Sequence, residues 1–415
     1  MNRTERQDQI VRRIQALNFR CYIEAATGFG KSIVAIKAAK LADKPVVHVI
    51  VPRISIKQSW EKYKDIIPFE TYVVNSYFNK REAEPDVIIA DEIHRYSNED
   101  AKVFSKIITE HNSSYIIGLS ATLDNDKRKF LKRHGILRAD YVPIEECLEK
   151  GYISQFRFIN VGIKLPHERH VLYNHIDRKL NGVRKILASM LGYRGIYSNM
   201  RTLMNTQDRN HQNVVNRAYE AGVVNVKTNR RFERNEIVSL AFAMNSLYAK
   251  RSEFIHLSEE KINVASQIIR ETNRKTVTFS QRIDTIDELA KSTGYPYHSK
   301  TKKSDKDKYM DLFMNDSKGV LHSGSSIKEG FDCEDITQGI QLSRTSKKLD
   351  LEQYLGRVVR IFEDETSFFW NLYLLDTQDQ VWVENSTAGI PVVENLKVKM
   401  NETSFLSNFI ARSNS

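Results

Sequence analysis

The stretch Ala25-Ala26-Thr27-Gly28-Phe29-Gly30-Lys31-Ser32 follows an apolar run at residues 19–23 and precedes a helical pattern at residues 33–41. Glycines at a strand-to-helix turn let backbone N–H groups approach phosphate oxygens, and the helix N-terminus adds a favourable dipole. A lysine at this position reaches the β- and γ-phosphates, and the hydroxyl that follows it ligates Mg²⁺. The stretch therefore predicts an ATP-binding loop with these candidate residues: Thr27, Gly28, Phe29, Gly30, Lys31 and Ser32.

Two carboxylates, Asp91 and Glu92, come directly after a second apolar run at residues 87–90. Ligands bind at the carboxyl ends of the strands in a parallel sheet, so this pair is expected near the phosphate loop. Asp91 is the candidate to hold Mg²⁺ together with Ser32. Glu92 is the candidate to orient and deprotonate the attacking water.

Short apolar runs alternate with amphipathic stretches over the first 125 residues, which predicts a parallel sheet covered by helices on both faces. The other runs lie at residues 46–51 and 115–119, and the other amphipathic stretch at residues 101–110. The pattern returns at residues 275–279, 320–322, 339–342 and 368–375. We expect an α/β fold with a first unit at residues 1–150, a linker and insertion at 151–255, a second unit at 256–400 and a flexible tail at 401–415.

The region between the two units reads as mostly helical and strongly basic. Residues 167–255 hold 15 lysines and arginines against 7 acidic residues, which is +8 of the net charge of +11. Tyrosines and Phe232 are interleaved with basic residues that include Arg230 and Arg231. One hypothesis is a helical clamp or wedge that holds nucleic acid by its phosphates and stacks on a base; the other is a solvated helical linker with core tyrosines.

Composition narrows the class of protein. A chain of 415 residues suits two or three domains, and its basic surplus favours polyanionic partners. No apolar run approaches the roughly 20 residues needed to cross a bilayer, so we expect no membrane partner. The three cysteines are far apart and give neither a disulfide framework nor a zinc spacing, which favours a reducing, cytoplasmic location.

The stretch from Gln353 to Arg360 matches Gln-x-x-Gly-Arg-x-x-Arg, the arginine-finger motif of helicase superfamily 2, which this chain resembles. In a helix, Arg357 and Arg360 share one face, and their guanidinium groups can stabilise charge on the γ-phosphoryl group. The resemblance implies two tandem RecA-like domains and an ATPase whose catalytic residues are Lys31, Glu92, Gln353, Arg357 and Arg360.

Further stretches resemble this family's motifs in its usual order. Asp91-Glu92-Ile93-His94 and Ser120-Ala121-Thr122 imply that His94, Ser120 and Thr122 couple the ATP site to nucleic acid. Arg6-Gln7-Asp8-Gln9 makes Gln9 the adenine candidate, although a polar helix surface also explains it. Gly330 and Asp332 are expected near the ribose. The resemblance assigns backbone contacts to Ser280 and Lys300, and to Arg53, which an exposed arginine explains equally well.

The resemblance is closest to the DExH group of phage recombination and repair helicases (UvsW-like), RecG-like branch migrators and XPB-like translocases. It predicts an ATP- and Mg²⁺-dependent motor that unwinds or remodels duplex, forked or branched DNA in recombination, repair or replication. The compact chain suits a phage-encoded enzyme acting in the host cytoplasm. The alternatives are a duplex translocase without strand separation, an RNA helicase and a nucleotide-gated clamp. The sequence leaves the oligomeric state open.

Overall fold

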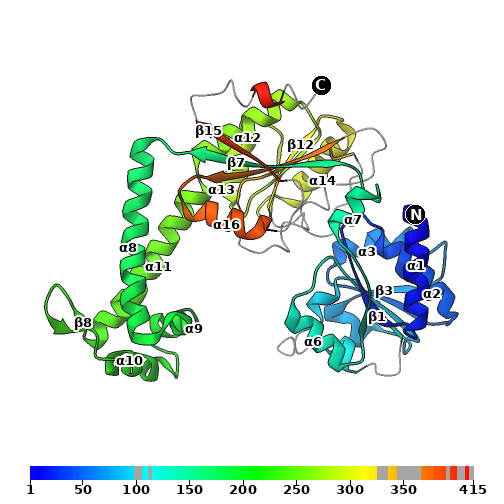
Figure 1. The fold of residues 1–415 in the computed structure, drawn as a ribbon, viewed down its shortest axis with the longest axis horizontal. Coiled ribbons are helices and arrows are strands. Elements are labelled where there is room, and N and C mark those ends of the chain that lie inside the picture. The colour runs from blue at the N-terminus through cyan, green and yellow to red at the C-terminus, as the bar shows by residue number, and fades with distance from the viewer. Residues whose placement is uncertain are drawn as a thin grey trace.

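The computed structural model describes residues 1–97, 105–110, 115–324, 335–343, 366–388, 393–399 and 407–410. It contains two parallel sheets, each flanked by helices, and a helical insertion that projects from the second sheet (Figure 1). The expected α/β fold with two tandem RecA-like domains and a basic helical insertion is confirmed.

Domain 1 is built on a six-stranded parallel sheet in the order β3-β2-β4-β5-β1-β6. The central strands are almost fully buried, which explains their runs of Val and Ile. The strands are β1 (Arg20–Ala25), β2 (Val47–Val51), β3 (Glu70–Val73), β4 (Val87–Ala90), β5 (Tyr115–Ser120) and β6 (Leu137–Val142).

Helices cover both faces of this sheet. Successive side chains of β1 point to opposite faces, so Ile23 packs with Ile10 and Val34 while Tyr22 packs with Ile93 and Phe130. The helices are α1 (Arg3–Ala16), α2 (Lys31–Ala42), α3 (Ile54–Glu61), η1 (Val74–Ser76), α4 (Tyr77–Lys80), η2 (Ile93–Arg95), α5 (Lys106–Thr109), α6 (Asn125–Arg133) and α7 (Ile144–Glu149).

Domain 2 contains a seven-stranded parallel sheet in the order β11-β12-β10-β13-β14-β7-β15. Its strands are β7 (Phe156–Lys164), β10 (Thr276–Phe279), β11 (Tyr295–Tyr297), β12 (Val320–Ser323), β13 (Gln338–Gln341), β14 (Ser367–Leu374) and β15 (Val393–Lys399). Its helices are α12 (Glu259–Thr272), α13 (Ile283–Ala290), α14 (Lys303–Asn315) and α16 (Gln378–Thr387).

Strand β7 lies where the sequence predicted only a linker and helices. It pairs with β14 on one side and β15 on the other, so the second sheet begins before the insertion. Polar residues interrupt its apolar pattern: Arg157 pairs with Glu394, and Asn160 accepts a hydrogen bond from Asn371. Cross-strand partners distant in sequence satisfy these groups, and a local pattern cannot show such partners.

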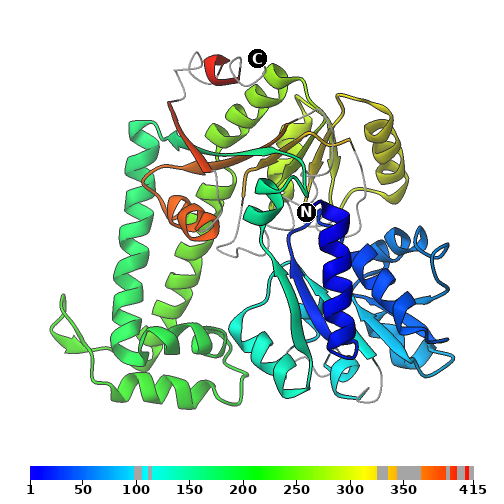
Figure 2. The same ribbon diagram turned by 45° about the vertical axis from the view of Figure 1, so that its right-hand side comes forward.

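The insertion therefore interrupts domain 2 between β7 and α12. Two long antiparallel helices form a stalk that carries two shorter helices and a hairpin at its far end (Figures 1 and 2). It has a core of its own, which includes Leu187, Ile196 and Ile237. Its elements are α8 (His167–Leu191), α9 (Tyr193–Met204), α10 (His211–Glu220), β8 (Val224–Asn225), β9 (Arg230–Arg231) and α11 (Arg234–His256).

The described part of the C-terminal tail packs against domain 2. Ile410 is buried, and the ring of Phe409 lies edge-on to Trp370 at 5.9 Å between centroids. These contacts differ from the flexible tail expected at residues 401–415. Within the described residues, no helix is both long and apolar enough to cross a membrane.

Candidate nucleotide-binding site

The predicted phosphate loop runs from the end of β1 into the start of α2. Gly28 and Gly30 have φ values of 90° and 93°, a left-handed conformation that L side chains rarely adopt. Gly30 is the N-cap residue directly before α2, and no side chain caps that helix end. With no side-chain cap, this end of α2 is suited to bind an anion.

Two side chains from α1 hold the loop by hydrogen bonds, and neither was predicted as a site residue. Arg3 donates to the carbonyl oxygens of Gly28 and Phe29 at 2.8 and 3.0 Å, and Gln7 donates to that of Phe29 at 2.8 Å. These hydrogen bonds fix the two carbonyl groups toward α1. Arg3 and Gln7 are four residues apart on α1, a helical spacing that places them on one face.

Gln9, the adenine candidate, is half-buried on the same helix. Its side-chain oxygen accepts a hydrogen bond from Arg6 at 3.0 Å. The buried Arg6 is itself fixed by Asp140 at 2.6 Å and Glu146 at 2.7 Å. The glutamine amide is therefore oriented by an ion-paired arginine, and its role in adenine binding stays a prediction.

The positive charge of Lys31 acts on both carboxyls of the acidic pair and favours their ionised forms, which indicates that the lysine lies near them. Its Nζ donates to the carbonyl oxygen of Ala25 at 2.9 Å. Burial and the neighbouring Glu92 charge raise the pKa of Asp91 to about 6, and Trp60 donates to its Oδ2 at 3.0 Å. The fold thus brings the phosphate-loop lysine and the two carboxylates to one point.

Glu92 has an unusual backbone, with φ at 55°, where β4 turns into η2. Burial alone raises the pKa of its carboxyl, but the nearby His94 imidazole and Lys31 charge outweigh burial and lower it. One carboxyl oxygen lies 3.2 Å from His94 Nδ1. A carboxylate that stays ionised suits a group that accepts a proton from water.

His94 also contacts the end of the neighbouring strand β5. Its Nδ1 lies 3.2 Å from the Ser120 hydroxyl, which donates to the carbonyl oxygen of Thr122 at 2.8 Å. The three predicted coupling residues are thus joined in one hydrogen-bonded group beside Glu92. Their coupling role stays a prediction.

Comparisons with known proteins show which families and relatives this chain is similar to. Residues 260–362 match the helicase conserved C-terminal domain family, and residues 1–85 and 75–125 match the family of the type III restriction enzyme res subunit. The chain is 24% identical over 362 residues to the DNA 3'-5' translocase XPB2 of Sulfurisphaera tokodaii, covering 80% of this chain and 73% of the relative.

The chain is a superfamily 2 helicase. Solved structures share its fold: the Pyrococcus furiosus Hef helicase domain has a TM-score of 0.54 at 17% identity, covering 91% of this chain and 97% of that one. Dbp5 of S. cerevisiae, bound to RNA and ADP BeF3, has a TM-score of 0.57 at 8% identity, covering 98% and 97%. Membership in this superfamily implies a nucleic-acid-dependent ATPase.

The part of this helicase's predicted site that comes from the second domain lies outside the described residues. It comprises the ribose candidates and the arginine-finger stretch: Gly330, Asp332, Gln353, Arg357 and Arg360.

Three residues outside the insertion are predicted to contact nucleic acid, and they differ in how exposed they are. Arg53 is exposed at the end of β2, and Lys300 is exposed after β11. Ser280 is buried after β10, and its hydroxyl accepts from the Arg282 backbone at 3.1 Å and contacts Ser343. The side chain of Ser280 thus shapes its own loop, whereas Arg53 and Lys300 lie at the protein surface.

The two arginines of the insertion that were predicted to contact nucleic acid already have protein partners. Arg230 pairs with Glu236 at 2.8 Å. Arg231 stacks on the Tyr219 ring at 3.9 Å and donates to the Tyr219 carbonyl oxygen. Other basic residues of the insertion are exposed: Arg178, Lys179, Arg194, Arg201, Arg209, Arg217 and Lys227. Whether any of them contacts nucleic acid stays a prediction.

The base of the insertion is joined to domain 2 by partly buried polar contacts. Arg169 on α8 pairs with Glu260 on α12 at 3.0 Å, and the Tyr173 hydroxyl accepts from the Gln378 backbone at 2.7 Å. Arg251 on α11 pairs with Asp177 on α8 at 2.7 Å, which joins the two stalk helices. The insertion is therefore fixed to domain 2 at its base.

Proposed function

We propose that this helicase is a DNA-dependent ATPase that unwinds or remodels duplex, forked or branched DNA. The observation that carries the proposal is the convergence of Lys31, Asp91 and Glu92 at one point, next to the group formed by His94 and Ser120. The choice of DNA is supported by the relative from Sulfurisphaera tokodaii, which is described as a DNA translocase.

Different residues of the described site carry out different parts of ATP hydrolysis. Backbone N–H groups of the phosphate loop and the Lys31 ammonium group bind the phosphates. Ser32 and Asp91 are suited to hold Mg²⁺, which when bound neutralises charge on the phosphate oxygens. The ionised Glu92 orients the attacking water and accepts its proton.

Hydrolysis also needs the second domain in this proposal. Arg357 and Arg360 supply positive charge to the γ-phosphoryl group, so turnover requires the two domains to close around ATP. Since the insertion is fixed to domain 2 by Arg169 and Glu260, closure carries it with that domain. Its exposed basic residues then act as a clamp on DNA phosphates.

Displacement assays test this function. The protein is given ATP and either a forked DNA or a duplex that carries a triplex-forming strand, with Glu92→Gln as the inactive control. Release of a strand from the fork supports the helicase. Release of the triplex strand alone supports the second candidate, a duplex translocase, which the description of the relative favours. Release of neither strand contradicts both.

A separate experiment tests whether the insertion acts as a clamp on DNA. Arg178→Glu, Arg201→Glu and Lys227→Glu are combined in one protein, because all three side chains are exposed and lie outside the insertion core. We expect weaker DNA binding with a smaller dependence on salt. Unchanged affinity and salt dependence would favour the solvated-linker alternative.

A further inference from the structure

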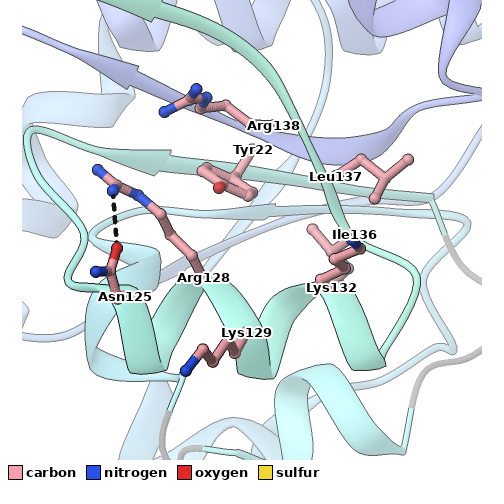
Figure 3. Close-up of a pocket in the computed structure, with 8 residues that line it drawn as sticks. All are labelled: Tyr22, Asn125, Arg128, Lys129, Lys132, Ile136, Leu137 and Arg138. Atoms are coloured by element: carbon pink, nitrogen blue, oxygen red, sulfur yellow. Dashed lines mark hydrogen bonds between the residues drawn. The ribbon is translucent and has the colours of Figure 1, made fainter.

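A basic pocket lies at the edge of the domain 1 sheet, beneath α6. Its volume is about 570 Å³, and Figure 3 shows the residues that line it: Tyr22, Asn125, Arg128, Lys129, Lys132, Ile136, Leu137 and Arg138. Helix α6 and the edge strand β6 form its walls, and Tyr22 of β1 lies between them. Helix α6 lies on the side of domain 1 that faces the insertion (Figures 1 and 2).

Four of the lining side chains are basic. In Figure 3 Arg128 from α6 and Arg138 from β6 lie beside the Tyr22 ring, while Lys129 extends from α6 away from that ring and is exposed. The Arg128 and Arg138 side chains are 35% and 44% exposed, so both remain open to a ligand. Planar guanidinium groups in this arrangement match the oxygens of a phosphate.

The carboxylate at the base of this cluster is Glu24, whose side chain is fully buried. Arg128 donates to it at 2.8 and 3.2 Å, and Arg138 donates to it at 3.3 Å. Two nearby acidic groups are neutralised elsewhere, since Asp124 pairs with Lys127 and Asp140 pairs with Arg6. The four basic groups and Glu24 together leave a positive surplus at the pocket.

Glu24 also connects the pocket to the ATP site. It directly precedes Ala25, where the phosphate loop begins, and it accepts a hydrogen bond from the Leu123 backbone at 2.9 Å. Leu123 follows Thr122, whose carbonyl oxygen is bonded to Ser120, and Ser120 contacts His94. A continuous series of contacts therefore runs from Arg128 and Arg138 to the residue beside Glu92.

We propose that this pocket binds a backbone phosphate of the nucleic acid, and that Glu24 is a positioning residue that reports its occupancy to the catalytic carboxylate. A phosphate that engages Arg138 competes with Glu24 for the same guanidinium group. The hydrogen bond from the Leu123 backbone to Glu24 changes in response. This change alters the loop after β5, which is linked to His94 through Ser120. This inference rests on the proposed function, because it requires a nucleic-acid-stimulated ATPase.

Two variants and a matched control test the pocket. Lys129→Ala combined with Lys132→Ala removes two rim charges, and Arg138→Gln removes the more exposed partner of Glu24. The control combines Arg12→Ala with Lys40→Ala, two exposed residues on α1 and α2, which pack on the opposite face of the sheet. ATPase is titrated with duplex and forked DNA, and thermal unfolding verifies that each variant is folded.

We expect the lysine variant to need about tenfold more DNA for half-maximal stimulation, with a smaller salt dependence. Arg138→Gln should also lower the stimulated rate at saturating DNA, while the control behaves as wild type. If both variants titrate like the control while the wild type is stimulated, the pocket is wrong and the proposed function stands. If DNA and RNA leave the wild type unstimulated, the proposed function fails and the pocket proposal fails with it.

Discussion

The imidazole of His94 lies 3.2 Å from the Ser120 hydroxyl, which joins the end of β4 to the end of β5 in domain 1. The same nitrogen lies 3.2 Å from the Glu92 carboxylate. His94 thus contacts both the carboxylate that is expected to activate water and the serine at the end of β5. We infer that His94 passes the state of that loop to the catalytic carboxylate.

Replacing His94 by alanine tests this link. We expect the nucleic-acid-stimulated ATPase rate to fall about tenfold, as for loss of a contact worth roughly 1.4 kcal/mol in the transition state. The rate without nucleic acid should fall less, because Lys31 and Asp91 keep their places. His94→Gln, which retains a hydrogen-bonding side chain, is the matched comparison. An equal loss of the two rates would show that His94 supports hydrolysis but does not couple it.

The role of Glu92 predicts a separation of ATP binding from hydrolysis. In Glu92→Gln the loop and Lys31 remain, so ATP should bind, while the hydrolysis rate falls by about 10² or more through loss of the general base. Equilibrium binding of a fluorescent ATP analogue and single-turnover hydrolysis give the two quantities. Hydrolysis at the wild-type rate would contradict the assignment of Glu92.

Gly30→Ala should weaken ATP binding through the shape of the phosphate loop. A β-carbon at Gly30 would lie 2.7 Å from Gln7 Nε2 and 3.0 Å from Arg3 Nη2, in a left-handed conformation. Strain of this kind is on the order of 1 kcal/mol, so we expect a severalfold higher KM for ATP. Gly182→Ala is the matched control, because nothing lies within 4 Å of its added β-carbon. If the two variants have the same KM, the loop geometry does not determine ATP affinity.

The buried His322 predicts a loss of stability in mild acid. Burial lowers its pKa from 6.5 to about 4, and it lies between Thr278 and Thr293. The unfolded chain takes up the proton first, so the free energy of unfolding should fall as pH drops from about 6.5 towards 4, by about 3 kcal/mol in total. Urea unfolding at a series of pH values measures this, and His322→Gln should flatten the dependence. An unchanged slope in that variant would assign the effect to other groups.

Short stretches of sequence were sufficient to predict the buried strands of domain 1 and the motifs of the ATP site. The strands that contain Ile23, Val49 and Ile89 are apolar because helices cover both faces of their sheet, and this burial is visible as runs of Val and Ile. The phosphate loop and acidic pair were visible because their residue types follow from phosphate and metal chemistry.

Residues that act through distant partners could not be predicted in this way. Arg3 contacts the loop across 26 positions of sequence, and Glu24 meets Arg128 across 104. Strand β7 was missed for the same reason, since Arg157 finds Glu394 only after 237 residues. From the sequence alone, a polar residue whose partner is distant in the chain cannot be distinguished from an exposed polar residue.

The central claim is that nucleic acid, and DNA in particular, drives the ATPase of this chain. Steady-state ATP hydrolysis measured without nucleic acid and with single-stranded, duplex, forked and four-way DNA, and with RNA, tests it most directly. We predict the strongest stimulation by duplex or branched DNA, with none in Glu92→Gln. Stimulation by RNA alone would contradict the choice of DNA, and a rate indifferent to every nucleic acid would contradict the motor itself.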